Sequence, residues 1–493
     1  MKRQSGILLH PTSLPSPYGI GDLGPEAYRF VEFLHASGQK LWEVLPLTIP
    51  DSHGSPYASS SSMAGNWMLV SPDLLVQDRL LDRKDLPKKQ PVGPVHYPTV
   101  RRERLKLLLK SFSFFALNAT AAQRRSFESF QKREAHWLTA FAQYKALRYF
   151  FHGKPWFEWP QPLANRSAKT LAAWNRKLRH EIMFHEYPQW LFSVQWKRLK
   201  RYAHQNGVRI FGDVPFFIAH DSADVWTNKR LFSIGRGNMP RDVSGAPPDC
   251  FSAAGQFWGD PHYDWRAMEK TRFRWWVRRM KKAFELYDIT RLDHFRGYKS
   301  LWYIPFESRR PKDGRWVHVP GEKLFSELRR SLRSLPVIAE DLGTITQDVV
   351  DFRNGLRFPG MRVLCFAFDG SKNNFHLPES YPKHCVVYTG THDNNTSRGW
   401  AEKTGQPAHV RRALKYTKAT KKTFALKLIE VAMRSRANTV ITPLQDVLNL
   451  GSEARMNAPS TTTGNWSWRF GTKQLAPQHA RRLRTLIKKT KRP

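Results

Sequence analysis

Eight short apolar runs, most of them separated by helix-length amphipathic segments, constrain the fold of this chain more than any other feature. The runs cover residues 5–10, 40–47, 208–216, 287–293, 336–341, 361–368, 385–391 and 438–444. Strands that alternate with helices form parallel sheets, and eight of them over this length suit a closed barrel. The sequence therefore predicts an α/β fold, a (β/α)8 TIM barrel, with no separate C-terminal β-sandwich domain.

Two of the spacings between these runs are too long for simple loops. Residues 70–205 are rich in helical patterns, basic residues and aromatics, and residues 217–286 contain a loop rich in glycine and proline, GRGNMPRDVSGAPPDC. We expect residues 1–493 to form a single catalytic barrel. The two long segments are then a mostly helical insertion and a loop-rich insertion over the mouth of the site, built as subdomains around the C-terminal face.

Acidic residues collect where the predicted strands end. Asp213, Asp293, Glu340 and Asp393 each lie at or just after the last residues of an apolar run. The carboxyl ends of barrel strands carry the active sites of barrel enzymes. The sequence therefore predicts a catalytic site there.

The local context of these acids suggests different protonation states. Arg291 lies two residues before Asp293, on the same side of the strand by alternation, and favours the ionised carboxylate; a structural ion pair is the alternative interpretation. Glu340 is the acid we expect to face the barrel axis among other carboxylates, which raises the pKa of a proton donor. Its neighbour Asp341 points the other way and is expected to cap a helix.

A pair of carboxyl groups, one ionised and one protonated, is the arrangement that breaks glycosidic bonds. The string His392-Asp393-Asn394-Asn395 adds a further carboxylate and donors for hydroxyl groups, and 18 tryptophans supply flat surfaces for sugars. No His-x-x-x-His or His-x-x-Glu-His spacing suggests a metal site, and no glycine-rich phosphate loop is present. A carbohydrate enzyme that needs no metal or organic cofactor is the favoured interpretation.

The cysteine content and the length of the apolar runs indicate the cellular compartment. The three cysteines are odd in number and contain no Cys-x-x-Cys pair, which argues against a disulfide framework or a cysteine zinc site and for a reducing compartment. No apolar run approaches the ~18 residues of a membrane span. We expect a cytoplasmic protein with no membrane partner.

The formal charge of +39 would by itself suggest a polyanionic partner. The basic clusters are scattered, however, and several fall on helix-like patterns such as HVRRALKYTKATKKTFALKLIE, where a solvated helix face is the ordinary interpretation. A nucleic-acid partner is therefore not expected.

Long motifs resemble those of one family. GILLHPTSLPSPYGIGDLGPEAYRF, SPYASSSSMAGN, GDVPFFIAHDSADVW, RLDHFRG, IAEDLG, YTGTHDNNT and MNAPSTTTGNWSWR occur in family order along nearly the whole chain. The chain resembles the amylomaltases, or 4-alpha-glucanotransferases, of glycoside hydrolase family 77. The resemblance implies transfer of alpha-1,4-glucan segments from maltooligosaccharides or other alpha-glucans to the 4-hydroxyl of an acceptor.

The resemblance also implies residue roles. Asp293 would be the nucleophile, Glu340 the acid and then the base, and Asp393 a residue that stabilises the transition state. Contacts with the donor sugar are implied for Tyr57, Asp213, Trp258, Arg291, His294, His392 and Asn457.

The chain departs from the family pattern at a few positions. Cys250 stands where a tyrosine is usual, on a loop expected to roof the acceptor side, and Glu43 also replaces a more usual residue. The alternatives are an alpha-glucan hydrolase on the same scaffold and a basic protein that binds a polyanion.

Overall fold

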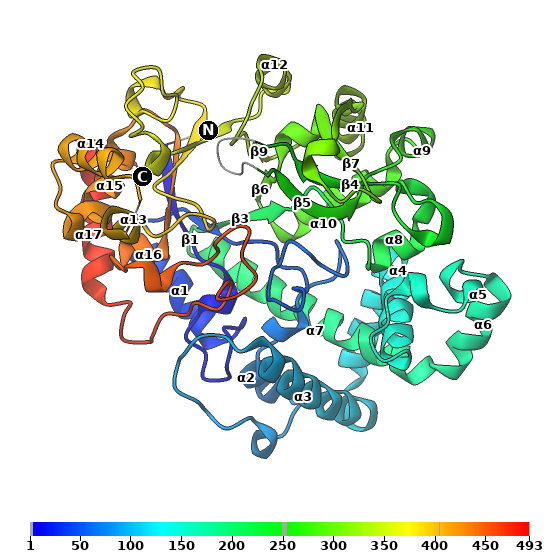
Figure 1. Cartoon of the computed structure of the whole chain (residues 1–493). Coiled ribbons are helices and arrows are strands. Elements are labelled where there is room, and N and C mark those ends of the chain that lie inside the picture. The colour runs from blue at the N-terminus through cyan, green and yellow to red at the C-terminus, as the bar shows by residue number, and fades with distance from the viewer. Residues whose placement is uncertain (1–2, 249–253, 404, 493) are drawn as a thin grey trace.

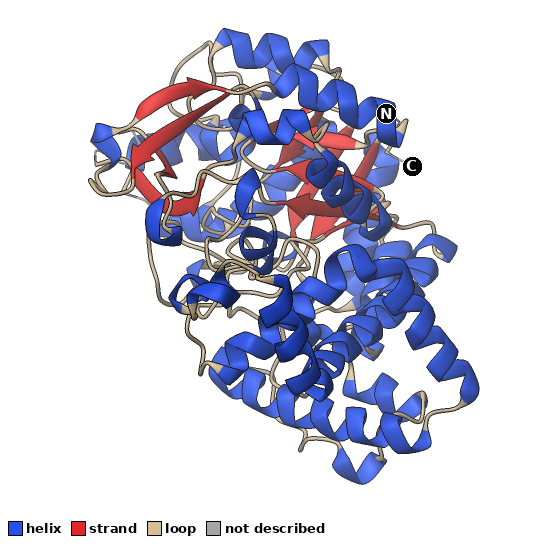
Figure 2. Cartoon of the chain, turned by 90° about the vertical axis from the view of Figure 1, so that its right-hand side faces the viewer, coloured by secondary structure: helices blue, strands red, loops and turns tan. Residues whose placement is uncertain are grey.

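The computed structural model describes residues 3–248, 254–403 and 405–492 and contains two β-sheets. The larger has eight parallel strands in the order β10-β11-β12-β1-β2-β3-β6-β9. Figure 1 shows these strands at the centre of the molecule, and Figure 2 shows them as a group separate from the second sheet. The strands are β1 (Gln4–Leu8), β2 (Leu41–Glu43), β3 (Arg209–Val214), β6 (Ile289–Leu292), β9 (Val337–Ala339), β10 (Gly360–Val363), β11 (Cys385–Tyr388) and β12 (Thr439–Pro443).

The sheet curls into a barrel. The two strands at the ends of the order meet, because the backbone N–H of Ala339, the last residue of β9, donates to the carbonyl of Pro359, the residue before β10, at 2.9 Å. Side chains also meet across the interior: the Tyr388 hydroxyl on β11 donates to Glu43 on β2 at 3.0 Å, although two other strands separate β11 from β2 in the sheet. The prediction of a (β/α)8 barrel is confirmed.

Each of the eight predicted strands is present, but shorter than its apolar run. The run at residues 40–47 forms strand only over Leu41–Glu43, because Pro46 cannot donate a ladder hydrogen bond.

Alternate residues of a barrel strand pack in two different hydrophobic cores. Ile7 of β1 packs in the shell beneath the helices, whereas Leu8 packs inside the barrel, as the period of two requires.

A helical region fills the chain between β2 and β3. Its two longest helices, α4 and α7, pack against each other, and α4 begins with a reciprocal capping box between Thr120 and Gln123. The helices are α2 (Pro72–Gln77), α3 (Tyr97–Asn118), α4 (Ala121–Phe150), α5 (Gln161–Ala164), α6 (Ala168–Lys177) and α7 (Arg179–Gln205).

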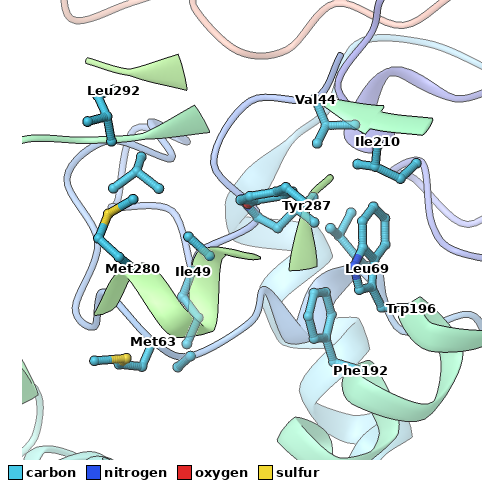
Figure 3. Close-up of a cluster of buried hydrophobic side chains, with 14 of the residues drawn as sticks. Val44, Ile49, Met63, Leu69, Phe192, Trp196, Ile210, Met280, Tyr287 and Leu292 are labelled. Carbon is cyan, nitrogen blue, oxygen red and sulfur yellow. The ribbon is translucent and has the colours of Figure 1, made fainter. Parts of the chain in front are cut away.

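This helical region shares its core with the barrel. Phe192 and Trp196 of α7 belong to the same buried cluster as Ile210 of β3 and Leu292 of β6, with Tyr287 among them (Figure 3). Burial of aromatic side chains at such a boundary contributes roughly 1.5–3 kcal/mol each. The helices therefore hold the barrel wall rigidly on this side.

The second sheet was not predicted. It is antiparallel in the order β5-β4-β7-β8, and its strands are partly exposed and irregular, with a register shift between Val243 and Gly245. Such strands lack the clean apolar alternation by which a strand is recognised. They are β4 (Asp242–Ala246), β5 (Gln256–Pro261), β7 (Ser300–Pro305) and β8 (Arg315–His318), and the same part of the chain contains α8 (Ala223–Thr227), α9 (Trp265–Lys270) and α10 (Arg274–Leu286).

The other helices lie around the barrel. They are α1 (Pro25–Ala36), α11 (Gly321–Leu332), α12 (Gln347–Gly355), α13 (Ser397–Lys403), α14 (Pro407–Thr417), α15 (Phe424–Arg434), α16 (Leu444–Val447) and α17 (Pro477–Thr490). Within the described ranges, no helix has the length and apolar character needed to cross a bilayer.

Candidate active site

Three neighbouring strands carry the first group of acids. Asp213 is the fifth residue of β3, Asp293 follows β6 and Glu340 follows β9. Because β3, β6 and β9 are adjacent in the sheet, their carboxyl ends bring these three acids side by side. The backbone fixes the spacing: the N–H of Asp293 donates to Val214, and the N–H of Glu340 donates to Leu292, both at 3.1 Å.

Arg291 joins two of the acids. Its guanidinium donates to Asp213 at 2.5 Å and to Asp293 at 2.7 Å. The side chains of Arg291 and Asp213 are 7% and 1% exposed, whereas that of Asp293 is 28% exposed. Arg291 is therefore buried beneath the site and presents one carboxylate, that of Asp293, to the solvent side.

The surroundings of Arg291 and Tyr57 keep both side chains protonated. Burial alone would lower the pKa of the Arg291 guanidinium, but Asp213 and Asp293 together raise that pKa well above its usual value. Burial also raises the pKa of Tyr57 well above that of a free phenol. Tyr57 therefore stays a hydrogen-bond donor, and its hydroxyl donates to Asp213 at 2.6 Å.

Glu340 has a different environment from Asp293. Its two carboxyl oxygens accept from the backbone N–H groups of His294 and Leu342, both at 2.8 Å, which fixes the orientation of the side chain. Burial raises the pKa of Glu340 to about 7; Arg291 opposes this rise and the charge of Asp293 adds to it. A group that exchanges its proton near neutral pH suits general acid and base catalysis.

A second group of residues surrounds Asp393. The amide of Asn457 donates to its carboxylate at 2.7 Å, and the ring of His392 lies 3.4 Å from its other oxygen. Arg455 donates to the backbone carbonyl of Asp393 at 2.8 Å. The carboxylate of Asp393 is 42% exposed, so it is positioned from behind while it remains open to a ligand.

Aromatic contacts connect the two groups. The rings of Tyr57 and His392 are stacked, with centroids 5.2 Å apart and an angle of 13° between their planes. Trp466 packs against both rings, at 5.8 Å from Tyr57 and 5.9 Å from His392. A single layer of rings therefore runs from the Asp213 side of the site to the Asp393 side.

Trp258 lies against His294, the residue that directly follows Asp293. It belongs to β5, is 39% exposed, and meets His294 edge to face with centroids 5.2 Å apart. Phe217 packs against both rings. His294 adopts a left-handed backbone with φ of 48°, and burial lowers its pKa to about 4, so its ring is neutral at pH 7. An exposed indole beside a neutral imidazole is a surface that suits a sugar ring.

The structure brings all ten predicted site residues into one connected group. Sequence reasoning assigned no role to Arg455, Phe217 or Trp466; the last lies in the quoted motif GNWSWR, and only the fold shows its contacts. One expectation was wrong: Asp341 does not cap α12, whose N-cap is Thr346. Asp341 is buried and instead pairs with Arg353 and accepts from the backbone of Met361 at 2.6 Å.

Glu43 lies inside the barrel below the acids. Its carboxyl group is 3% exposed, accepts from the Tyr388 hydroxyl, and has a second oxygen with no hydrogen-bond partner within the described residues. Burial raises the pKa of Glu43 to about 8, against the opposing effect of Arg291 and with a contribution from Asp213. Glu43 is therefore mostly an uncharged acid at pH 7. Cys250, the other unusual residue, lies outside the described residues.

No cluster of three or more histidine, cysteine, aspartate or glutamate side chains in the described ranges has a geometry that could hold a metal ion.

Comparison with known proteins identifies the family. A sequence profile described as 4-alpha-glucanotransferase matches residues 9–474. The chain belongs to the 4-alpha-glucanotransferase family, glycoside hydrolase family 77. Among curated members, it is 42% identical to the 4-alpha-glucanotransferase of Thermus thermophilus, with 100% of this chain and 99% of that protein covered. It is also 42% identical to the chloroplastic 4-alpha-glucanotransferase of Arabidopsis thaliana, over 95% of this chain and 82% of that protein.

A solved structure agrees with the family assignment. The amylomaltase from Streptococcus agalactiae, solved in complex with acarbose, is 35% identical and covers 100% of both chains with a TM-score of 0.95. The chain is accordingly an enzyme of alpha-glucan transglycosylation that transfers alpha-1,4-glucan segments between glucans. Hydrolysis, the alternative considered from the sequence, is not favoured.

Proposed function

We propose that this 4-alpha-glucanotransferase works by a retaining double displacement in which Asp293 is the nucleophile and Glu340 is first the acid and then the base. The observation that carries this assignment is the asymmetry between the two groups. Asp293 is held by the guanidinium of Arg291 and faces outward, whereas Glu340, beside it, has a pKa of about 7.

In the first displacement, the carboxyl group of Glu340 protonates the glycosidic oxygen of the donor. The bond between that oxygen and the anomeric carbon breaks, and a carboxylate oxygen of Asp293 bonds to the anomeric carbon. The shortened glucan leaves with the proton. The product on the enzyme is a β-linked glucosyl ester of Asp293.

In the second displacement, the ionised Glu340 takes the proton of the acceptor 4-hydroxyl. That oxygen attacks the anomeric carbon, the ester bond to Asp293 breaks, and the second inversion restores the alpha configuration. Both carboxyl groups return to their starting states, so the cycle needs no other proton donor or acceptor.

The other site residues are proposed to bind the sugar at the reacting centre. Asp393 has an exposed carboxylate fixed by Asn457 and His392, which suits hydrogen bonds to sugar hydroxyls that strengthen in the transition state. Tyr57 and Asp213 extend this polar surface on the other side. The S. agalactiae relative was solved in complex with acarbose, and we propose that the site of this chain takes maltooligosaccharides.

We propose that the segment 217–286 covers the acceptor side of the mouth. Trp258 of β5, in this segment, contacts His294, which directly follows Asp293. The family resemblance implies a donor contact for Trp258, but its place in this segment leads us to propose that an acceptor sugar stacks on it instead. Such a sugar would occupy the place that water needs, which favours transfer over hydrolysis.

The test uses a donor whose leaving group needs no proton. The Glu340→Gln variant, given an alpha-maltosyl fluoride, should form the glycosyl ester but resolve it slowly, because the base of the second step is missing. Mass spectrometry of the digested protein should then find two added hexose units on the peptide that contains Asp293.

The matched control is Asp293→Asn, which should form no ester and lose on the order of 10³-fold or more in kcat for transfer from maltotriose. An ester on a different residue, or an Asp293→Asn variant with the parent rate, would contradict the assignment. The expected cytoplasmic location and the absence of a nucleic-acid partner stay predictions.

A further inference from the structure

A second large hollow lies at the opposite end of the barrel from the acids. It has a volume of about 1040 Å³ and is lined by residues that precede or begin the strands, among them Lys40 before β2, Arg209 of β3 and Ile289 of β6. This volume slightly exceeds the roughly 300–1,000 Å³ that small-molecule sites occupy, so the hollow has room for a small organic ligand. Asp288 lies in the hollow and Asp293 five residues later in the active site, which places the two sites about 16 Å apart along β6.

The lining of the hollow is strongly cationic. It contains one carboxylate, that of Asp288, and two histidines, His204 and His384. Against these stand six basic side chains: Arg3, Lys40, Arg209, Arg329, Arg333 and Arg357.

The single carboxylate does not neutralise the hollow. Asp288 is already shared between Lys200 at 3.2 Å, His204 at 2.8 Å and the backbone N–H of Ile210 at 2.7 Å. Like charges gathered around one concave surface repel each other and create a local positive potential that attracts anions.

Three of the six cations are held in place by the protein. Arg3 donates to the carbonyls of Ser435 and Thr490, at 3.1 and 3.3 Å. Arg209 donates to the side chain of Gln4, and Arg329 donates to the carbonyl of Leu356. These contacts are to uncharged oxygens, so they orient the guanidinium groups without cancelling their charge.

The other three cations, Lys40, Arg333 and Arg357, are exposed. Within the described part of the chain, the side chains of Lys40, Arg333 and Arg357 form no hydrogen bond and no ion pair. The planar guanidinium fork of arginine matches the oxygens of a phosphate group and can bind them in pairs. One side of the same hollow is apolar, with Leu335, Leu356 and Phe358.

We propose that this hollow at the amino ends of the barrel strands binds a small organic anion that carries one or more phosphate groups. The phosphate oxygens are bound by Arg333, Arg357 and Lys40, whose side chains form no hydrogen bond with any described residue, and the organic part lies against Leu335, Leu356 and Phe358. The site is separate from the glucan site, because it lies at the other ends of the same strands.

The phosphate group could belong to a hexose phosphate or to a nucleotide, and calorimetry distinguishes these two sources. The full-length protein is titrated with glucose 6-phosphate, ADP and inorganic pyrophosphate at about 0.15 M salt, where charges beyond about 8 Å are screened. We expect saturable one-site binding for at least one of the three probes. Tighter binding of ADP than of the other probes identifies a nucleotide, and tighter binding of the hexose phosphate identifies a sugar phosphate. Binding should persist in excess maltotriose, because the glucan site is elsewhere.

Two double variants with the same change in net charge test whether binding depends on the cations of the hollow or on the overall charge of the protein. Arg333→Glu with Arg357→Glu should weaken binding at least tenfold, whereas Arg411→Glu with Lys415→Glu on α14, away from the hollow, should change it less than twofold. Equal weakening by both pairs, displacement by maltotriose, or no saturable binding of any probe overturns the proposal.

A labelling experiment checks the site without relying on charge-reversed variants. Phenylglyoxal modifies exposed guanidinium groups, and mass spectrometry locates them. The probe that binds should protect Arg333 and Arg357 in the parent protein and leave Arg411 as reactive as before. Modification of Arg333 and Arg357 that is unchanged by the probe contradicts the proposal.

Discussion

The two ends of the barrel are built from the same strands but have opposite chemistry. At the carboxyl ends of β3, β6 and β9 lie Asp213, Asp293 and Glu340, each fixed by short contacts. At the amino ends lies a hollow lined by six cations and one carboxylate. The acids at the first end are tied to Arg291, Tyr57 and backbone N–H groups, whereas three of the six cations at the second end form no side-chain hydrogen bond or ion pair with the described residues.

The difference between the two ends concerns where the positive charge of the chain lies. The site of chemistry is acidic although the formal net charge is +39. The excess of lysine and arginine is not concentrated at the catalytic end, where Arg291 is buried between Asp213 and Asp293 and Arg455 supports the backbone of Asp393. Part of the excess gathers instead at the far end of the barrel, where no step of glucan transfer takes place.

The largest expected effect comes from removing the cation at the carboxyl end. Arg291→Met leaves the buried carboxylate of Asp213 without its ion pair, so the free energy of unfolding should fall by about 3 kcal/mol, and misplacement of Asp293 should lower kcat about 10²-fold. Denaturant unfolding and transfer from maltotriose measure the two effects. The control is Arg209→Met, at the amino end of β3, which is exposed and should change stability by no more than about 0.5 kcal/mol. Similar losses of stability and of kcat in both variants would contradict the expected difference between the two ends of the barrel.

The pH dependence tests whether proton transfer is confined to the carboxyl end. The first displacement needs protonated Glu340, whose pKa is about 7, so kcat/KM should fall about tenfold per unit as the pH rises above that value. Initial rates with maltotriose between pH 5 and 9 give the profile. The Lys40→Ala variant, altered at the amino end, should keep the same profile; a profile that moves with Lys40 would show that the two ends are coupled.

Glu43, inside the barrel between the two ends, should govern stability more than rate. Burial raises the pKa of Glu43 in the folded protein to about 8, above the ordinary 4.5 of a glutamate. The folded state therefore retains a proton that the unfolded state releases, and stability falls as the pH rises from about 4.5 to about 8. Glu43→Gln cannot ionise and still accepts from Tyr388. Its Tm should exceed that of the parent by about 2 °C or more at pH 8.5, with little difference at pH 5. A constant difference across this range would show that Glu43 does not titrate as described.

The smallest expected effect concerns the acceptor side of the carboxyl end. Trp258→Ala removes a stacking surface worth about 0.5–1.5 kcal/mol, which corresponds to a rise of up to about tenfold in the KM of the acceptor. The ratio of transfer to hydrolysis should fall with it, measured as new oligosaccharides against new reducing ends. Trp316→Ala, on β8 of the same sheet and similarly exposed at 42%, is the matched control and should leave the ratio unchanged.

The barrel and the acids were predictable because each signal is local. A buried strand is an apolar run, and an acid at its end is visible in RLDHFRG or IAEDLG. The antiparallel sheet was missed, because β4 (DVSGA) and β5 (QFWGDP) contain no apolar run and no clear alternation, and β5 is partly exposed. The basic hollow was missed for a different reason. Its cations are separated by up to several hundred residues, from Arg3 to Arg357, and only closure of the barrel brings them together.

The antiparallel sheet is discontinuous along the chain: β4 and β5 precede the catalytic strand β6, whereas β7 and β8 follow it. Its central ladder joins the two halves, with Val243 opposite Ile304 and Ser244 opposite Tyr303. This sheet is therefore not an exchangeable module. A chimaera between family members that replaced only one half would leave β4 or β7 without its partner, so acceptor specificity has to be transplanted as two segments at once, with β6 retained between them.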